Sequence, residues 1–320
     1  MAEPYVGARK EIAFTPESVR GTSETHAAGD WQPHLGFDFK AMVDKVKDDP
    51  AMGRIEDNID HEVVHRSSGG GVPLRLTKQF LPNLFAMIFG HQPTPSSLGG
   101  GLYQRDYVVQ NNNQHQAFTV TVKDPIAGMK KYALGMLNTA GFEFNLDEIT
   151  KATLDIQAGK EEAGTGTPAY DTSYDVAFFM PTQIEFKFAD DVAGLAAASE
   201  TYLSNLSLQV NKNAIKEYAL GEEGPIDVVN QRFGLAGSLE MTYETTVLRD
   251  YAHNRTKKAV QIKLTDADGV YVQIQLPQVG FEDWSEGNDN NAYLKNTIAF
   301  FAERNNTSGM ALATVVNTES

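Results

Sequence analysis

The sequence predicts a mainly β protein with two tandem β-barrel or β-sandwich domains, each flanked by one α-helix. Three observations support this prediction. Short segments of alternating apolar and polar residues recur along the 320 residues, helical patterns are few, and the second half of the chain repeats the pattern of the first. A chain of this length also exceeds the usual size of one compact core, which favours two domains.

Strand patterns account for most of the chain. Alternation with a period of two turns one face of a strand towards a core and the other towards solvent. The sequence Asp266-Ala-Asp-Gly269 separates two such segments and predicts a hairpin turn. The clearest alternating segments are residues 118–122, 184–188, 206–210, 260–264 and 270–274.

Two segments predict helices. In residues 81–89, apolar side chains recur at positions i, i+3, i+4 and i+7, which gives a helix one apolar face. Pro82 suits the first turn of this helix, and Gly90 can end it. A second helix is expected within residues 242–252, so that each half of the chain has one.

An internal repeat is the most informative feature of the sequence. Residues 62–77 lie without gaps over residues 227–242, and two valines, a glycine, a leucine and a threonine recur in register. Residues 132–143 match residues 271–282 in the same way, and both segments end in Gly-Phe-Glu. Because the matches keep the same order along both halves, they indicate a duplicated unit.

The repeat divides the chain near Pro181. We expect a first domain over residues 1–181, which includes an N-terminal arm, and a second over residues 182–320, which includes a C-terminal extension. The first has 23 acidic and 16 basic residues, and the second has 19 and 11. Both halves are therefore acidic to a similar degree, and the charge belongs to the repeated unit.

Composition excludes several classes of function. The chain has 42 acidic and 27 basic residues, and its formal net charge of −15 opposes a protein that grips nucleic acid through a basic face. The same charge opposes anchoring on an anionic membrane. There is no cysteine, which excludes disulfides and thiolate chemistry. Without a membrane-spanning stretch or the apolar core of a secretion signal, we expect synthesis in the cytoplasm, no membrane partner and no cofactor.

One motif raises an enzymatic alternative. His61-Glu62-Val63-Val64-His65 matches the H-E-x-x-H signature of zinc peptidases, in which a helix places both histidines on one metal and the glutamate beside it as the base. Here the two central residues are β-branched and the run enters a Ser-Ser-Gly-Gly-Gly stretch, a poor setting for a helix. We therefore predict no catalytic residue and no metal site, and keep a zinc-dependent hydrolase as the alternative.

Several segments, taken in order, resemble one family. They are FTPESVRGT at residues 14–22, IEDNI at residues 55–59, GGGVPLRL at residues 69–76 before the first predicted helix, and the Gly-Phe-Glu sequences at Phe142 and Phe281. In this order and in its duplication, the chain resembles the tail tube proteins, or major tail proteins, of long-tailed bacteriophages. It is similar to the form that carries two tube domains per chain, and the similarity covers nearly the whole chain.

The resemblance implies a structural virion protein and not an enzyme. Tube domains of this family are small β-barrels or sandwiches that form rings of six, so a two-domain chain would form a trimeric ring with pseudo-sixfold symmetry. Stacked rings make a tube around a tape-measure protein, with terminator and distal tail proteins at its ends, and the DNA genome passes through the lumen. An acidic lining would let DNA pass without binding because it repels phosphates.

Two long segments, residues 44–68 and 211–232, occupy matched positions in the two halves. Loops of this length in compact domains usually carry function, so we expect these segments to contact the neighbouring ring. The predicted contact residues are Asp44, Lys45, Asp48, Asp49, Arg54, Glu56, Asp57, Lys212, Lys216, Glu217, Glu222, Glu223 and Arg232.

A phage adhesion or carbohydrate-binding β module is a second alternative. Such a module would carry clusters of exposed aromatic residues on its loops, whereas Trp31 and Trp284 are isolated in the sequence. The inner tube of a contractile tail is a close variant of the tail tube hypothesis.

Overall fold

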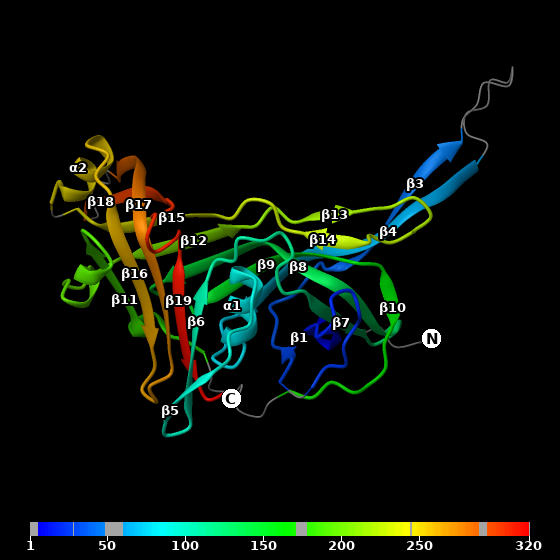
Figure 1. Ribbon diagram of the computed structural model, residues 1–320. Helices are drawn as coiled ribbons and strands as arrows, with labels where there is room; N and C mark the ends of the chain where they lie inside the picture. Colours follow the sequence, from blue (N-terminus) through cyan, green and yellow to red (C-terminus); the bar gives the residue numbers. More distant parts are fainter. Residues whose placement is uncertain are drawn as a thin grey trace, which may run out of the picture.

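The computed structural model describes residues 6–27, 29–48, 60–170, 178–243, 245–287 and 293–319. Within these residues the protein is mainly β, with two α-helices, α1 (Leu81–Phe89) and α2 (Val247–His253) (Figure 1). The predicted fold class is confirmed, although the described strands form open sheets and do not close a barrel within one chain. Neither helix is long and apolar enough to cross a membrane.

The strands follow the predicted alternation. The first half contains β1 (Glu11–Pro16), β2 (Trp31–Gln32), β3 (Lys40–Asp48), β4 (Asp60–Arg75), β5 (Ser96–Gly99), β6 (Leu102–Val108), β7 (Phe118–Asp124), β8 (Gly128–Asn145), β9 (Lys151–Ala158) and β10 (Glu161–Ala163). The second half contains β11 (Ile184–Ala189), β12 (Asn205–Asn211), β13 (Ile215–Glu217), β14 (Asp227–Val229), β15 (Gly234–Thr242), β16 (Lys258–Thr265), β17 (Tyr271–Gly287), β18 (Lys295–Ala302) and β19 (Leu312–Asn317).

Eight antiparallel strands form one continuous sheet, here called the main sheet, in the order β3–β4–β9–β8–β12–β15–β18–β17. This order is one unit written twice, because β12, β15, β18 and β17 repeat the pairings of residues 34–40, which lead into β3, and of β4, β9 and β8. The two units join where β8 pairs with β12, from Thr139 opposite Asn211 to Asn145 opposite Asn205.

A second layer of strands repeats in the same manner. The long strands β8 and β17 leave the main sheet towards their N-terminal ends, where β8 pairs with β7 and β17 pairs with β16. β7 then pairs with β1 as β16 pairs with β11, and β10 lies on β8 where β19 lies on β17. In addition β6, from the first half, pairs with β19 at the end of the chain, so the halves interlock (Figure 1).

The core lies between these layers and the helices. Side chains opposite one another across the main sheet share a face, and one row contains the buried Phe142, Leu208 and Phe300 together with Gly237. Gly237 is needed in this row because a Cβ atom there would lie 2.5 Å from the Phe300 ring and would press on the carbonyl oxygen of Ser207. The neighbouring strands therefore approach each other across a residue without a side chain.

The two helices differ in their surroundings. Every residue of α1 except Asn83 is buried, and the helix ends at Gly90 with a φ of 91°, as the sequence predicts. By contrast, Leu248 is the one buried residue of α2. Thr242, the first residue of the predicted helix, belongs to β15, and α2 begins at Val247. The second helix is therefore shorter than predicted, and most of its surface is uncovered.

We predict that Gly237→Ala lowers the free energy of unfolding by about 2 kcal/mol, because the added methyl group overpacks the row against Phe300. Gly234→Ala is the matched control, since a Cβ atom at Gly234 meets nothing within 4 Å. Chemical denaturation of both variants measures the difference. Equal stability of the two variants would contradict the packing argument.

Candidate assembly surfaces

The first predicted contact segment is mostly strand, and the expectation of a loop over residues 44–68 was wrong for its described part. β3 and β4 pair antiparallel from Lys40 opposite Gly69 to Asp48 opposite Asp60, and the hairpin extends away from the body of the protein (Figure 1). Of the predicted contact residues, Asp44, Lys45 and Asp48 are exposed on β3. Four others, Asp49, Arg54, Glu56 and Asp57, lie outside the described residues.

The second predicted segment lies against the first within the same chain. Residues 211–232 contain the two-stranded sheet of β13 and β14, which runs beside β4 (Figure 1). The Arg66 guanidinium pairs with Glu223 at 3.2 Å, and the backbone N–H of Arg66 donates to the carbonyl oxygen of Glu223 at 2.7 Å. Lys216 Nζ donates to Ser67 Oγ at 3.0 Å. Burial lowers the pKa of Lys216, although the charges of Asp44 and Asp155 oppose the shift.

The remaining predicted contact residues divide into two groups. Glu217, Glu222 and Arg232 are exposed and stay candidates for contact with another subunit. Lys212 is not at the surface, because its side chain is 1 % exposed and its Nζ donates to the carbonyl oxygen of Met87 at 2.5 Å. The length and matched position of residues 211–232 made Lys212 a contact candidate, but the connection after β12 turns this side chain towards the end of α1.

The connection between β12 and β15 is fixed to the first half by several polar contacts. Arg20 is the centre of this junction: its guanidinium pairs with Asp227 at 2.7 Å and donates to the carbonyl oxygens of His115 and Val228. Asp227 also accepts a hydrogen bond from Gln114 at 2.9 Å. Sequence reasoning missed this junction because its partners lie 95 to 208 residues apart.

The zinc-peptidase motif lies in a strand. His61 and His65 belong to β4, where residues four apart are spread along the strand and do not converge on one metal. The His65 ring instead packs against the Tyr218 ring with centres 4.1 Å apart, and His61 lies beside Lys45. Among the described residues there is no group of three or more histidine and acidic side chains placed to hold a metal ion.

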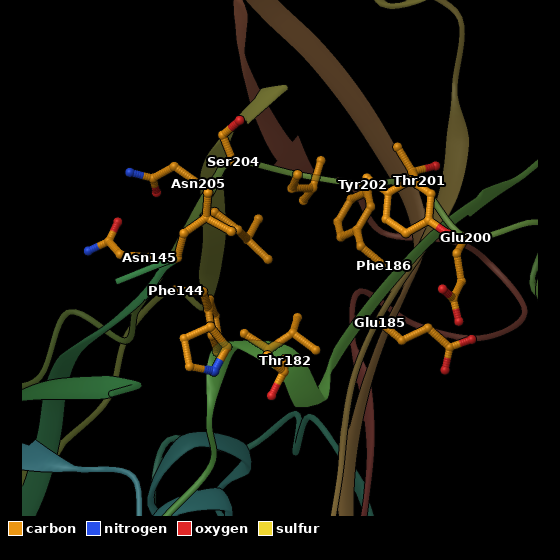
Figure 2. A pocket seen from close by; sticks show the side chains of 15 residues that line it. Phe144, Asn145, Thr182, Glu185, Phe186, Glu200, Thr201, Tyr202, Ser204 and Asn205 are labelled. Atoms are coloured by element: carbon orange, nitrogen blue, oxygen red, sulfur yellow. The ribbon is translucent and has the colours of Figure 1, made fainter. Parts of the chain in front are cut away.

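A hollow of about 300 Å³ lies where the two halves join. Figure 2 shows Phe144 and Asn145 at the end of β8 beside Ser204 and Asn205 at the start of β12, with Tyr202 across from them. Tyr202 is 84 % exposed, which is unusual for a large aromatic side chain. The alternation pattern gave no signal for this site, because it lies in the connection before β12.

The main sheet has two edges that pair with no further strand in the described part of the chain. One is the outer side of β3. The other is the outer side of β17, where continuous pairing with β16 ends at Leu276, with one further pair at Val279 after a bulge, while pairing with β18 continues to Gly287. Unpaired edges present rows of N–H and C=O groups that can bind another strand. The protein therefore carries one exposed sheet edge at each end of its duplicated sheet.

The family assignment agrees with this architecture. The sequence model of the phage tail tube protein family matches residues 7–300. The chain belongs to the phage tail tube protein family. No curated protein matches it. The resemblance found in the sequence is thus confirmed. The protein is a structural component of the phage tail. Members of its family assemble into a tube together with other tail components.

The buried lysine at the junction leads to a pH prediction. Burial and the nearby charge of Arg20 lower the pKa of Lys212 from 10.5 to about 7. Between about pH 7 and 10.5 the unfolded chain binds more protons at this lysine than the folded chain, so the free energy of unfolding rises with pH in that window. One proton contributes a slope of up to about 1.4 kcal/mol per pH unit.

Lys212→Met should therefore flatten this rise in urea unfolding experiments between pH 7 and pH 10. The exposed Lys45→Met on β3 is the control and should keep the slope of the unmodified protein. A slope unchanged by Lys212→Met would show that this lysine does not carry the pH dependence.

Proposed function

We propose that three copies of this tail tube protein close into a ring with pseudo-sixfold symmetry and that rings stack into the tube that conducts the DNA genome. The observation that carries the proposal is the main sheet, which repeats one four-stranded unit and ends in two unpaired edges. In this proposal the chain consists of two tube domains, residues 1–181 and 182–320. Six domains in a ring, as the family resemblance implies, then require three chains.

The junction inside the chain supplies a template for the junction between chains. Within the chain, the edge of β8 receives β12. The corresponding edge of β17 would receive the first-half counterpart of β12, which is the stretch over residues 35–40 that leads into β3. This stretch runs beside β4, and its Leu-x-Phe-x-Phe alternation matches Leu-x-Leu-x-Val in β12. Lys40 lies opposite Gly69 as Asn211 lies opposite Gly234, which fixes the correspondence.

The polar face of the main sheet suits a lumen. One row across it contains Lys151, Glu143, Ser207, Ser238 and Ala299, and the neighbouring positions are mostly small and polar. A face without a basic cluster has few cationic side chains to replace the counterions condensed on DNA, which supports passage without specific binding. Because Lys151 accompanies Glu143, the negative field of this face is weaker than the net charge suggests.

The hairpin of β3 and β4 is the proposed contact between rings. Asp44, Lys45 and Asp48 are exposed on it, and it extends beyond the sheet that forms the ring (Figure 1). The tape-measure protein would contact the polar face, and terminator and distal tail proteins would bind the first and last rings. We place the protein in the virion tail after synthesis in the host cytoplasm, with no membrane contact.

Electron microscopy of the purified protein tests the assembly. At high concentration we expect rings or tubes with threefold symmetry, because both sheet edges become paired only when copies join. Monomers that persist under all concentrations and salt conditions would contradict self-assembly.

Engineered cysteines test the edge pairing, and the chain has no cysteine of its own to interfere. Asn211 lies opposite Thr139 within the chain, and the equivalent residues are Lys40 and Gln278. Oxidised Lys40→Cys/Gln278→Cys protein should form covalent dimers and trimers on a non-reducing gel. Each single variant should remain monomeric on the gel and serves as the control. Tubes that form in the double variant without any cross-link would overturn this edge pairing.

A further inference from the structure

The outer part of the β3–β4 hairpin, beyond its bulge, has two faces of different charge. Lys45 lies opposite Val63 and Lys47 lies opposite His61, so these four side chains share one face, here called the basic face. On it, Lys45 Nζ lies 3.4 Å from His61 Nε2. The acidic residues of this part of the hairpin are on the other face: Asp48, Asp60 and Glu62. In a chain with a net charge of −15, two exposed lysines without a described acidic neighbour on their face suit an acidic partner.

The hollow of about 300 Å³ beside Tyr202, here called the Tyr202 hollow, has the complementary chemistry. Glu185 and Glu200 lie next to each other at one side of it, and no lysine or arginine of the described chain lines it (Figure 2). Tyr202 is 84 % exposed, and Leu146, also in its wall, is 64 % exposed. Large apolar side chains that gather uncovered at one hollow mark a surface for another molecule. The hollow therefore offers an acidic rim and an apolar floor.

The hairpin and the hollow lie at opposite ends of the main sheet. The pairing of β8 with β12 ends where Asn145 lies opposite Asn205, and both residues line the hollow. At the other end of the sheet, β3 and β4 continue past Lys40 and Gly69 as the hairpin (Figure 1). One chain cannot bring its hairpin to its own hollow. In a stack of rings that all face the same way, the hairpin end of one ring meets the hollow end of the next.

Each chain has one projecting hairpin and one such hollow at the join of its two halves. Within the described chain the second half has no second projecting hairpin, because the corresponding residues 211–232 lie against β4. Arg66 pairs there with Glu223, and Lys216 donates to Ser67. A ring of three chains would therefore present three hairpins on one side and three Tyr202 hollows on the other.

We infer that the basic face of the hairpin docks on the Tyr202 hollow of a copy in the next ring. The two lysines lie over the two glutamates of the hollow, and Val63 covers Tyr202. The inference rests on the proposed stack of rings, and it names the surface that receives the hairpin. One exposed ion pair contributes little, but three equal sites on each ring act together. Because the hollow lies only at the joins within chains, docking lets a ring that looks sixfold stack in threefold steps alone.

Charge reversal with rescue tests the docking in the full-length protein. In Lys45→Glu/Lys47→Glu, rings should still form, but the mean tube length in electron micrographs should fall at least about tenfold, because like charges meet at the hollow. Adding Glu200→Lys to this variant should restore most of the length. Asp48→Lys, on the opposite face of the hairpin, is the matched control and should give tubes of the unmodified length.

The outcomes separate this inference from the proposed function. Tubes of unmodified length in the double lysine variant, or no recovery on adding Glu200→Lys, would overturn the docking while leaving the tube intact. Shortened tubes in Asp48→Lys would assign the contact to the other face of the hairpin and also overturn it. An unmodified protein that forms neither rings nor tubes would instead contradict the proposed function.

Engineered cysteines give a second readout. In Lys47→Cys/Glu200→Cys, the two cysteines lie at opposite ends of one chain and meet only between rings. Oxidised tubes should therefore give a ladder on a non-reducing gel that continues beyond trimers, whereas unassembled protein should stay monomeric. Asp48→Cys/Glu200→Cys is the control and should not cross-link, because Asp48 is on the other face. Tubes of the first variant that yield only monomers would exclude this contact.

Discussion

The backbone pairing of β8 with β12 is the contact on which the rest of the structure depends. It turns two four-stranded units into one sheet, and it sets the direction and spacing with which one half follows the other. Each hydrogen bond between the two strands contributes only about 1 kcal/mol net. Leaving the backbone N–H and C=O groups of a buried edge unpaired would cost more, so the two units stay joined because the pairing satisfies these groups. The junction around Arg20 and Lys212 then holds the long connection of the second half on the first.

The sequence was sufficient for the class of fold, the first helix and the duplication. Alternating segments such as residues 118–122 and 260–264 became β7 and β16, and the matched segments before each helix became β4 and the strands β14 and β15. These features are local, because alternation and spacing depend on neighbouring residues. The repeat could be found because the same local pattern occurs twice in the same order.

What the sequence could not supply was the pairing between distant segments. Residues 44–68 were expected to form a loop, whereas residues 44–48 and 60–68 pair as strands. The side chain of Lys212 was expected at the surface, and only its approach to Met87 shows why a lysine can lie inside. Similarly, a motif of zinc peptidases became part of β4, since its two β-branched residues favour a strand there.

The pairing of β6 with β19 has a consequence for synthesis. β6 ends at Val108, whereas its partner begins at Leu312, and Thr314 Oγ1 donates to the Asp106 carboxylate at 2.7 Å across that pair. A ribosome must therefore make and release residues up to β19 before β6, which already pairs with β5, acquires its second neighbour. Chains truncated before β19 would therefore lack this strand pair and would contribute an incomplete fold to a growing polymer.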